Sequence, residues 1–235
     1  MNKRLFSNFR ILLFLSLIGI LGQVSASSIT DFLLKVVGTY EGETTWDGGK
    51  SPITTTIVQQ GNSVGGTWAY PGQPHYPITF IKALPEKREL IIGWKQDQSY
   101  GQASFLFSPD YSSFEGTWGY GSDYEGAGTW SGISEFLLKV VGTYEGETDG
   151  SPITTTIVQQ GNSVGGTWAY PGQPHYPITF IKALPEKREL IIGWKQDQSY
   201  GQASFLFSPD YSSFEGTWGY GSDYEGAGAW SGVAP

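Results

Sequence analysis

Hydrophobic and polar residues alternate along much of this chain with a period of two residues. In Ala103–Phe107 and Phe114–Tyr120, aromatic or small residues occupy every second position. Such alternation predicts β-strands that have one buried face. A helical period extends no further than a single turn at Thr30–Leu34. We therefore predict eight strands in the first half of the chain, near residues 35–44, 52–60, 63–70, 76–84, 89–96, 100–107, 113–120 and 126–131.

Turn-forming residues separate these runs. Pro71–Pro74 and Gly121–Asp123 are typical of the Gly-, Pro- and Asp-rich stretches between them. Short strands joined by tight turns favour an antiparallel up-and-down meander. Eight such strands can close into a barrel, which removes exposed sheet edges. The pattern therefore predicts an all-β fold built from eight-stranded up-and-down barrels.

The chain carries this strand set twice. Ser51–Gly128 recurs without a difference as Ser151–Gly228, and Phe32–Thr44 recurs as Phe136–Thr148. The repeated unit of about 100 residues has the size of a whole domain. We therefore predict two near-identical domains, at residues 30–132 and 134–233, with two equivalent sites per chain. The copies differ in length where Thr45–Lys50 is replaced by Asp149-Gly150, in a Gly-rich stretch that predicts a hairpin tip.

The first 26 residues have the pattern of a secretory signal peptide. Lys3, Arg4 and Arg10 precede or flank the short apolar run Ile11–Leu21, and small residues end the segment at Val24–Ala26. An uncleaved membrane anchor is the alternative, but this run is shorter than the ~20 residues of a spanning helix. We expect cleavage after Ala26 and a secreted protein, periplasmic or extracellular, that is not embedded in a membrane.

Charge and cysteine content narrow the classes of partner. The chain has 14 basic and 22 acidic residues and no cysteine. Removal of the signal peptide would leave a net charge of about −11, and phosphate binding needs an excess of Lys and Arg. We therefore expect no nucleic-acid partner. Without disulfides, each domain must be stable through its own core.

Short Gly-Thr-aromatic motifs resemble the strands of the avidins. They stand at Gly38–Tyr40, Gly66–Trp68, Gly116–Trp118 and Gly128–Trp130, and the apolar turn before the first resembles the entry to lipocalin-type barrels. The resemblance implies an eight-stranded meander barrel with a ligand mouth at one end. It does not extend to the biotin site, because the positions of the family's Asn and Ser hold residues of other types here: Gly42 and Trp46 in the first copy, Gly146 and Gly150 in the second.

Aromatic residues are the main candidates for ligand binding. Trp and Tyr combine an apolar face with a hydrogen-bonding tip, which suits sugar rings and other amphipathic ligands. The alternative is that they fill a barrel interior, and the regular strands around Trp118 and Trp130 favour a core position for these two. The predicted binding residues are Tyr70, His75, Tyr76, Trp94, Tyr100, Tyr120, Asp123 and Tyr124, with Tyr170, His175, Tyr176, Trp194, Tyr200, Tyr220, Asp223 and Tyr224 in the second copy.

Catalytic and metal-binding patterns are weak. His75 has no Ser, Cys or second His nearby with which to form a triad or a metal set. The carboxylates are scattered, although a glycosidase pair such as Glu41 with Glu115 stays open at this level. Asp123 with Glu125 could hold calcium, but no D-x-D-x-D-G loop is present, so we favour a solvated acidic turn. We predict no enzyme, no cofactor and no metal.

Three functional hypotheses remain. The first is a secreted, non-catalytic tandem binding protein that recognises carbohydrate or a cell-surface glycan through aromatic-rich loops. The second is a carrier of a small apolar ligand, of the lipocalin or avidin type. The third is a structural component of an extracellular matrix or surface.

Overall fold

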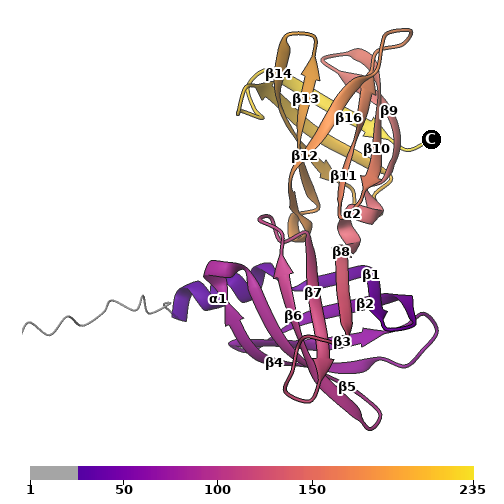
Figure 1. The fold of residues 1–235 in the computed structure, drawn as a ribbon. Helices are drawn as coiled ribbons and strands as arrows, with labels where there is room; N and C mark the ends of the chain where they lie inside the picture. The colour runs from indigo at the N-terminus through magenta and orange to yellow at the C-terminus, as the bar shows by residue number, and fades with distance from the viewer. Residues whose placement is uncertain (1–25) are drawn as a thin grey trace, which may run out of the picture.

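The computed structural model describes residues 26–235, and it consists of two closed antiparallel β-barrels in tandem (Figure 1). The prediction of an all-β protein with two eight-stranded up-and-down barrels is confirmed. The predicted signal peptide lies outside the described residues, apart from Ala26, which begins the first helix. Among the described residues, no helix is long and apolar enough to cross a membrane.

The first barrel follows helix α1 (Ala26–Lys35) and pairs each strand with its neighbours in sequence. Its closing pair is β1 with β8, in which Tyr40 lies opposite Ser134. The elements are β1 (Gly38–Trp46), β2 (Gly49–Gln60), β3 (Ser63–Ala69), β4 (Tyr76–Leu84), the 3₁₀ turn η1 (Pro85–Lys87), β5 (Glu89–Gln96), β6 (Ser99–Phe107), β7 (Ser113–Tyr120) and β8 (Gly128–Ser134).

The second barrel repeats this plan after helix α2 (Glu135–Lys139). In the predicted joint at residues 132–135, β8 runs on to Ser134 and α2 begins at the next residue. The elements are β9 (Gly142–Thr148), β10 (Ser151–Gln160), β11 (Ser163–Ala169), β12 (Tyr176–Leu184), the 3₁₀ turn η2 (Pro185–Lys187), β13 (Glu189–Gln196), β14 (Ser199–Phe207), β15 (Ser213–Tyr220) and β16 (Gly228–Val233).

Alternation along the strands decides which side chains fill each barrel. In β6, Ala103, Phe105 and Phe107 are fully buried, whereas Tyr100 and Leu106 are exposed on the outside. Successive side chains of a strand point to opposite faces, so residues of equal parity line the interior. The deep core is aromatic, with Phe105 stacked on Phe114 at a centroid distance of 4.2 Å.

Helix α1 closes one end of the first barrel. The predicted helical turn at residues 30–34 is a ten-residue helix, and the predicted strand at residues 35–44 starts later, at Gly38. The helix buries Phe32, Leu33 and Val36, and the Phe32 ring packs edge-on against Phe107 at 6.3 Å. This apolar face covers too few turns to give a clear helical period in the sequence, and packing against the barrel stabilises it instead.

A buried tyrosine ties this helix to the barrel. The Tyr40 hydroxyl donates to the carbonyl oxygens of Val36, at 3.1 Å, and Tyr111, at 3.3 Å. Burial, with a smaller contribution from the charge of Asp110, raises the pKa of the Tyr40 phenol well above its usual value. Tyr144 makes the same two bonds in the second barrel, to Val140 and Tyr211. Both barrels are therefore closed at the helical end.

Candidate functional site

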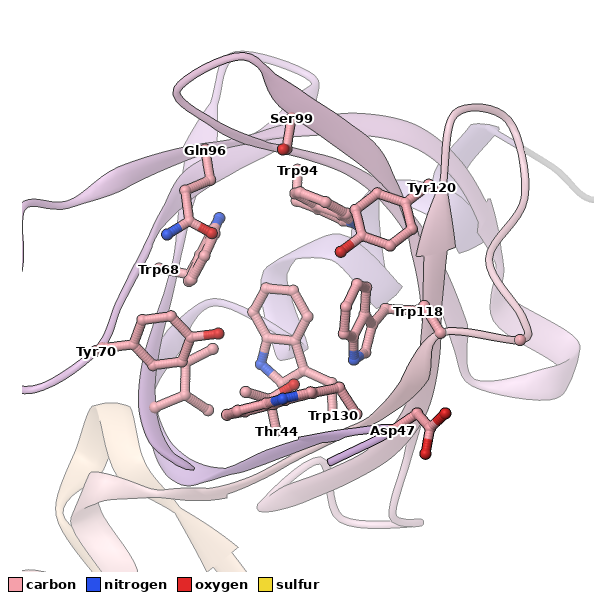
Figure 2. A pocket seen from close by; sticks show the side chains of 14 residues that line it. Thr44, Asp47, Trp68, Tyr70, Trp94, Gln96, Ser99, Trp118, Tyr120 and Trp130 are labelled. Atoms are coloured by element: carbon pink, nitrogen blue, oxygen red, sulfur yellow. The ribbon is translucent and has the colours of Figure 1, made fainter. Parts of the chain in front are cut away.

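The end of the first barrel opposite α1 contains a cavity of about 480 Å³. We call this end the first mouth; it is formed by the β1–β2, β3–β4, β5–β6 and β7–β8 connections. Figure 2 shows a ring of aromatic side chains around the cavity, with the hydroxyl groups of Tyr70 and Tyr120 directed inward. The lining residues are Thr44, Trp46, Asp47, Ile53, Trp68, Tyr70, Trp94, Gln96, Ser99, Trp118, Tyr120, Gly126, Ala127 and Trp130.

Four tryptophans of this ring come from four different strands. Trp68 lies on β3, Trp94 on β5, Trp118 on β7 and Trp130 on β8. Each stands at an inward-facing position near the mouth end of its strand, so the strand register alone brings them together. Their rings meet edge to face, as in the Trp68–Trp130 pair at 5.5 Å and the Trp94–Trp118 pair at 5.6 Å. The ring is thus a packed aromatic wall around the cavity.

Hydrogen bonds hold three of the four indoles. Trp130 Nε1 donates to Thr55 Oγ1 at 2.9 Å, and Trp118 Nε1 donates to the Thr45 carbonyl at 3.1 Å. Trp94 Nε1 donates to two carbonyl oxygens, one of which belongs to Gly119, at 3.2 Å. Because these donors are satisfied, the orientations of the three rings are fixed before any ligand enters.

The fourth indole is different. Trp68 is 4% exposed and lines the cavity, and its Nε1 has no hydrogen-bond partner among the described residues. A buried donor left without a partner costs about 1–3 kcal/mol. An acceptor oxygen on a ligand in the cavity would recover that cost. The equivalent nitrogen of Trp168 is buried without a partner in the same way, so both barrels carry this feature.

The remaining polar groups are mostly uncharged. Thr44, Gln96 and Ser99 supply hydroxyl and amide groups, and burial raises the pKa of Tyr70, with smaller contributions from Tyr120 and Tyr76. The Tyr70 phenol is therefore protonated at neutral pH and can both donate and accept. Among the described residues that line the cavity, only Asp47 carries a charged side chain, and its carboxylate points away from the cavity centre in Figure 2. This chemistry suits an uncharged, ring-bearing ligand.

The predicted binding residues divide into two groups. Tyr70, Trp94 and Tyr120 line the first mouth. Tyr170, Trp194 and Tyr220 line its counterpart in the second barrel, where the cavity is about 80 Å³. Tyr76 packs against the Trp68 ring at 4.9 Å, behind the lining, as Tyr176 does against Trp168. The structure therefore brings only part of the predicted set together around one cavity.

The other predicted residues lie outside that cavity. Tyr100 and Tyr200 are both 64% exposed on the outer face of the barrels. His75 is exposed in the β3–β4 loop, with Nδ1 3.4 Å from Thr67 Oγ1, and His175 repeats this arrangement. Asp123 accepts from the backbone N–H of Glu125 at 3.0 Å, which is a turn contact, and Asp223 does the same. Tyr124 is half-buried in the β7–β8 loop, and Tyr224 is half-buried in the β15–β16 loop.

Strand parity was the signal for residues that the candidate set omitted. Trp68, Trp118 and Trp130 have the same inward parity as the buried residues of their strands, so their positions near the strand ends mark the mouth. The two tryptophans expected in the core do point inward, and they also line the cavity. Trp46 lies in the Gly-rich hairpin that was predicted as a tip, so nothing local marked it as part of the wall.

Metal coordination has no site in the described part of the chain. Within residues 26–235, no three or more His, Asp or Glu side chains gather so that they could hold a metal ion. Glu41 is engaged on the outer face, where its carboxylate accepts from Thr54 Oγ1 at 2.9 Å. Glu115 accepts from Asn162 Nδ2, at 3.2 Å, a contact between the two copies.

Comparisons with known proteins add no family. No family model matches the chain, and no curated protein sequence matches it. One similar solved structure is a protein of unknown function from the DUF3598 family of Nostoc punctiforme, 13% identical over 83% of this chain and 82% of that chain. Its TM-score is 0.22, which is too low to support an argument about fold or function.

Proposed function

We propose that the protein is a secreted, non-catalytic binding protein that takes a saccharide, such as the end of a glycan, into the first mouth. The observation that carries the proposal is the aromatic wall around a 480 Å³ cavity. Trp68 belongs to this wall and has a buried N–H without a hydrogen-bond partner among the described residues. Cavities of about 300–1,000 Å³ are typical of small-molecule sites. Indole and phenol rings offer flat apolar faces to a sugar ring, and their N–H and O–H groups can bond its hydroxyls.

The character of the lining supports an uncharged ligand. Among the described lining residues there is no Lys, Arg or His to pair with an anion. Because the Tyr70 phenol stays protonated, it adds a donor without adding charge. The site would therefore prefer neutral sugars to sialylated or sulfated ones.

One observation favours a second candidate, a carrier of a small apolar ligand. The aromatic residues that line the site lie inside the barrel mouth, and the exposed loop residues His75 and Asp123 take no part in the lining. A ligand that enters a barrel mouth buries most of its surface, which suits an apolar molecule as well as a sugar. We propose a lipocalin- or avidin-type barrel as the fold relationship in either case.

Isothermal titration calorimetry of the full chain with neutral methyl glycosides tests the proposal. We expect saturable binding of at least one glycoside, and Trp46→Ala should weaken it about tenfold, or about 1.4 kcal/mol. Tyr100→Ala is the matched control, because Tyr100 is an exposed aromatic near the same end of the barrel but outside the cavity. It should leave the affinity unchanged.

Two results would overturn the proposal. If no neutral saccharide binds and an uncharged aromatic probe does, the apolar carrier replaces the glycan binder. If Tyr100→Ala weakens saccharide binding and Trp46→Ala does not, the site lies on the outer face of the barrel.

A further inference from the structure

The two barrels differ where the sequence repeat is broken, at the first hairpin of each. In the first barrel, β1 and β2 continue through the pairs Thr45–Lys50 and Trp46–Gly49. In the second barrel the ladder ends at the pair Thr148–Ser151, and Asp149-Gly150 form the turn. The four additional residues are thus two additional ladder pairs, which lengthen the hairpin and leave the register of the rest of the barrel unchanged.

The alternation of inward- and outward-facing residues along β1 decides which side chain the longer hairpin adds to the cavity wall. Tyr40 and Thr44 are buried inward-facing residues of β1, and Trp46 has the same parity. Its indole therefore continues the inner wall of the barrel beyond Thr44, the last residue of β1 that pairs with β8. Trp46 lines the cavity although it is 39% exposed. An exposed ion pair between Lys50 Nζ and Glu43 Oε1, at 3.0 Å, lies beside the added ladder pairs. The second barrel has no counterpart of Trp46 or Lys50.

The shorter hairpin places a carboxylate at the corresponding point of the second barrel. Asp149 Oδ1 accepts from the backbone N–H of Ala229 at 2.9 Å, and a Cβ added at Gly228 would meet this carboxylate. In the first barrel the same point holds backbone, since a Cβ at Gly128 would meet the Thr45 carbonyl. Asp149 also contributes, after burial, to the raised pKa of Tyr170, a residue of the second mouth.

The last strands of the two barrels, β8 and β16, differ at two positions, Thr129/Ala229 and Ile133/Val233, and the first of these lies beside the first hairpin. In the first barrel, Thr129 Oγ1 and Thr45 Oγ1 are hydrogen-bonded at 2.6 Å, and the Thr129 backbone N–H donates to Thr45 Oγ1 at 3.1 Å. In the second barrel Ala229 takes the position of Thr129, and Asp149 accepts its N–H instead of the threonine hydroxyl. The difference in hairpin length and the Thr129/Ala229 difference are therefore coupled, because the residue at this position bonds directly to the hairpin in each barrel.

The cavity volumes follow this change. The first mouth holds about 480 Å³ and the second about 80 Å³, although ten of their lining residues are of the same types. We propose that the segment Thr45–Lys50 is the specificity element of the protein: it enlarges the first mouth enough for a ring-bearing uncharged ligand, and without it the second mouth is too small for the same ligand. This inference rests on the proposed function and departs from the expectation of two equivalent sites per chain, because the chain would then bind one such ligand.

Two hairpin exchanges in the full chain test the inference. The first variant replaces Thr45–Lys50 by Asp-Gly and carries Thr129→Ala. The second replaces Asp149-Gly150 by the sequence Thr-Trp-Asp-Gly-Gly-Lys and carries Ala229→Thr. Each barrel then carries a hairpin that its near-identical neighbour already accommodates, so we expect both variants to fold. Far-UV circular dichroism and thermal melting check that they do. The probe is N-phenyl-1-naphthylamine, an uncharged aromatic fluorophore that brightens on entering an apolar site.

We expect the unmodified chain to bind one probe molecule. The shortened variant should bind it about tenfold more weakly or lose it. The second variant should bind two. Two equal sites in the unmodified chain, or unchanged binding after the first exchange, would overturn the inference. So would a complete lack of probe binding, because an open 480 Å³ mouth should admit this molecule. The saccharide titration described above decides the proposed function separately, so the two failures are distinguishable.

Discussion

The indole N–H of Trp118 on β7 donates to the backbone carbonyl of Thr45 in the first hairpin at 3.1 Å, although β8 lies between these two strands in the sheet. The equivalent nitrogen of Trp218 is buried without a hydrogen-bond partner among the described residues. One difference in hairpin length therefore satisfies a buried donor in one barrel and leaves it unsatisfied in the other.

This difference predicts unequal effects of one substitution. Trp118→Phe and Trp218→Phe remove similar ring area, but only the first removes a hydrogen bond. We expect Trp118→Phe to destabilise its barrel by about 1 kcal/mol more than Trp218→Phe destabilises the other. Urea denaturation of the two variants, followed by circular dichroism, measures the difference. Equal losses would show that the Trp118–Thr45 bond contributes nothing to stability.

The helix-closing tyrosines give a second prediction. Tyr40→Phe removes the donor for the carbonyls of Val36 and Tyr111 and leaves the ring in place. We expect a loss of about 1–3 kcal/mol, because the buried carbonyl of Val36 and the part-buried carbonyl of Tyr111 lose the hydroxyl proton that they share. Tyr144→Phe should cost a similar amount, since its two bonds are equivalent. Thermal melting of both variants checks this, and a melting temperature unchanged from that of the unmodified protein would contradict it.

The raised pKa of Tyr40 predicts a loss of stability in alkali. Burial, and then the charge of Asp110, raise the pKa of this phenol above the value of 10.0 for a free tyrosine. The unfolded chain therefore loses the Tyr40 proton at lower pH than the folded chain does, so stability is full below about pH 10 and falls as the pH rises above it. The pH dependence of the free energy of unfolding should be less steep above pH 10 in Tyr40→Phe. An identical slope would contradict the assignment.

A backbone prediction concerns the close approach of β2 and β3. Gly66 has φ of +150°, and a Cβ added there would overlap the carbonyl oxygen of Thr56. Gly66→Ala should therefore prevent the first barrel from folding normally. Gly61 has φ of +62° with open space around it, so Gly61→Ala should cost only about 1 kcal/mol. Circular dichroism and solubility distinguish the two variants. A well-folded Gly66→Ala protein would contradict the prediction.

Much of the fold could be predicted because its signals are local. Period-two runs such as Phe114–Tyr120 mark their own strands, and the exact repeat of Ser51–Gly128 requires two copies of one architecture. Register and closure follow from tight turns between consecutive strands. The helix α1 was harder to delimit, because it is stabilised by contacts of Phe32 with Phe107 and Tyr111, which are distant in sequence.

The site was less predictable because it depends on which barrel end stays open. Tyr100 and Tyr120 look alike in sequence, yet opposite strand parity leaves Tyr100 outside and puts Tyr120 in the lining. Trp46 becomes part of the wall only because two additional ladder pairs continue β1 past the mouth. Such information lies in the three-dimensional closure of the sheet, and short motifs do not contain it.

The most direct test of the first mouth as the binding site is a crystal structure of the full chain with the tightest-binding methyl glycoside. We predict the sugar inside the ring of tryptophans of the first barrel, with a ring face against Trp46 and an oxygen accepting from Trp68 Nε1. A sugar bound on the outer face beside Tyr100, with Trp68 Nε1 still without a partner, would contradict the account.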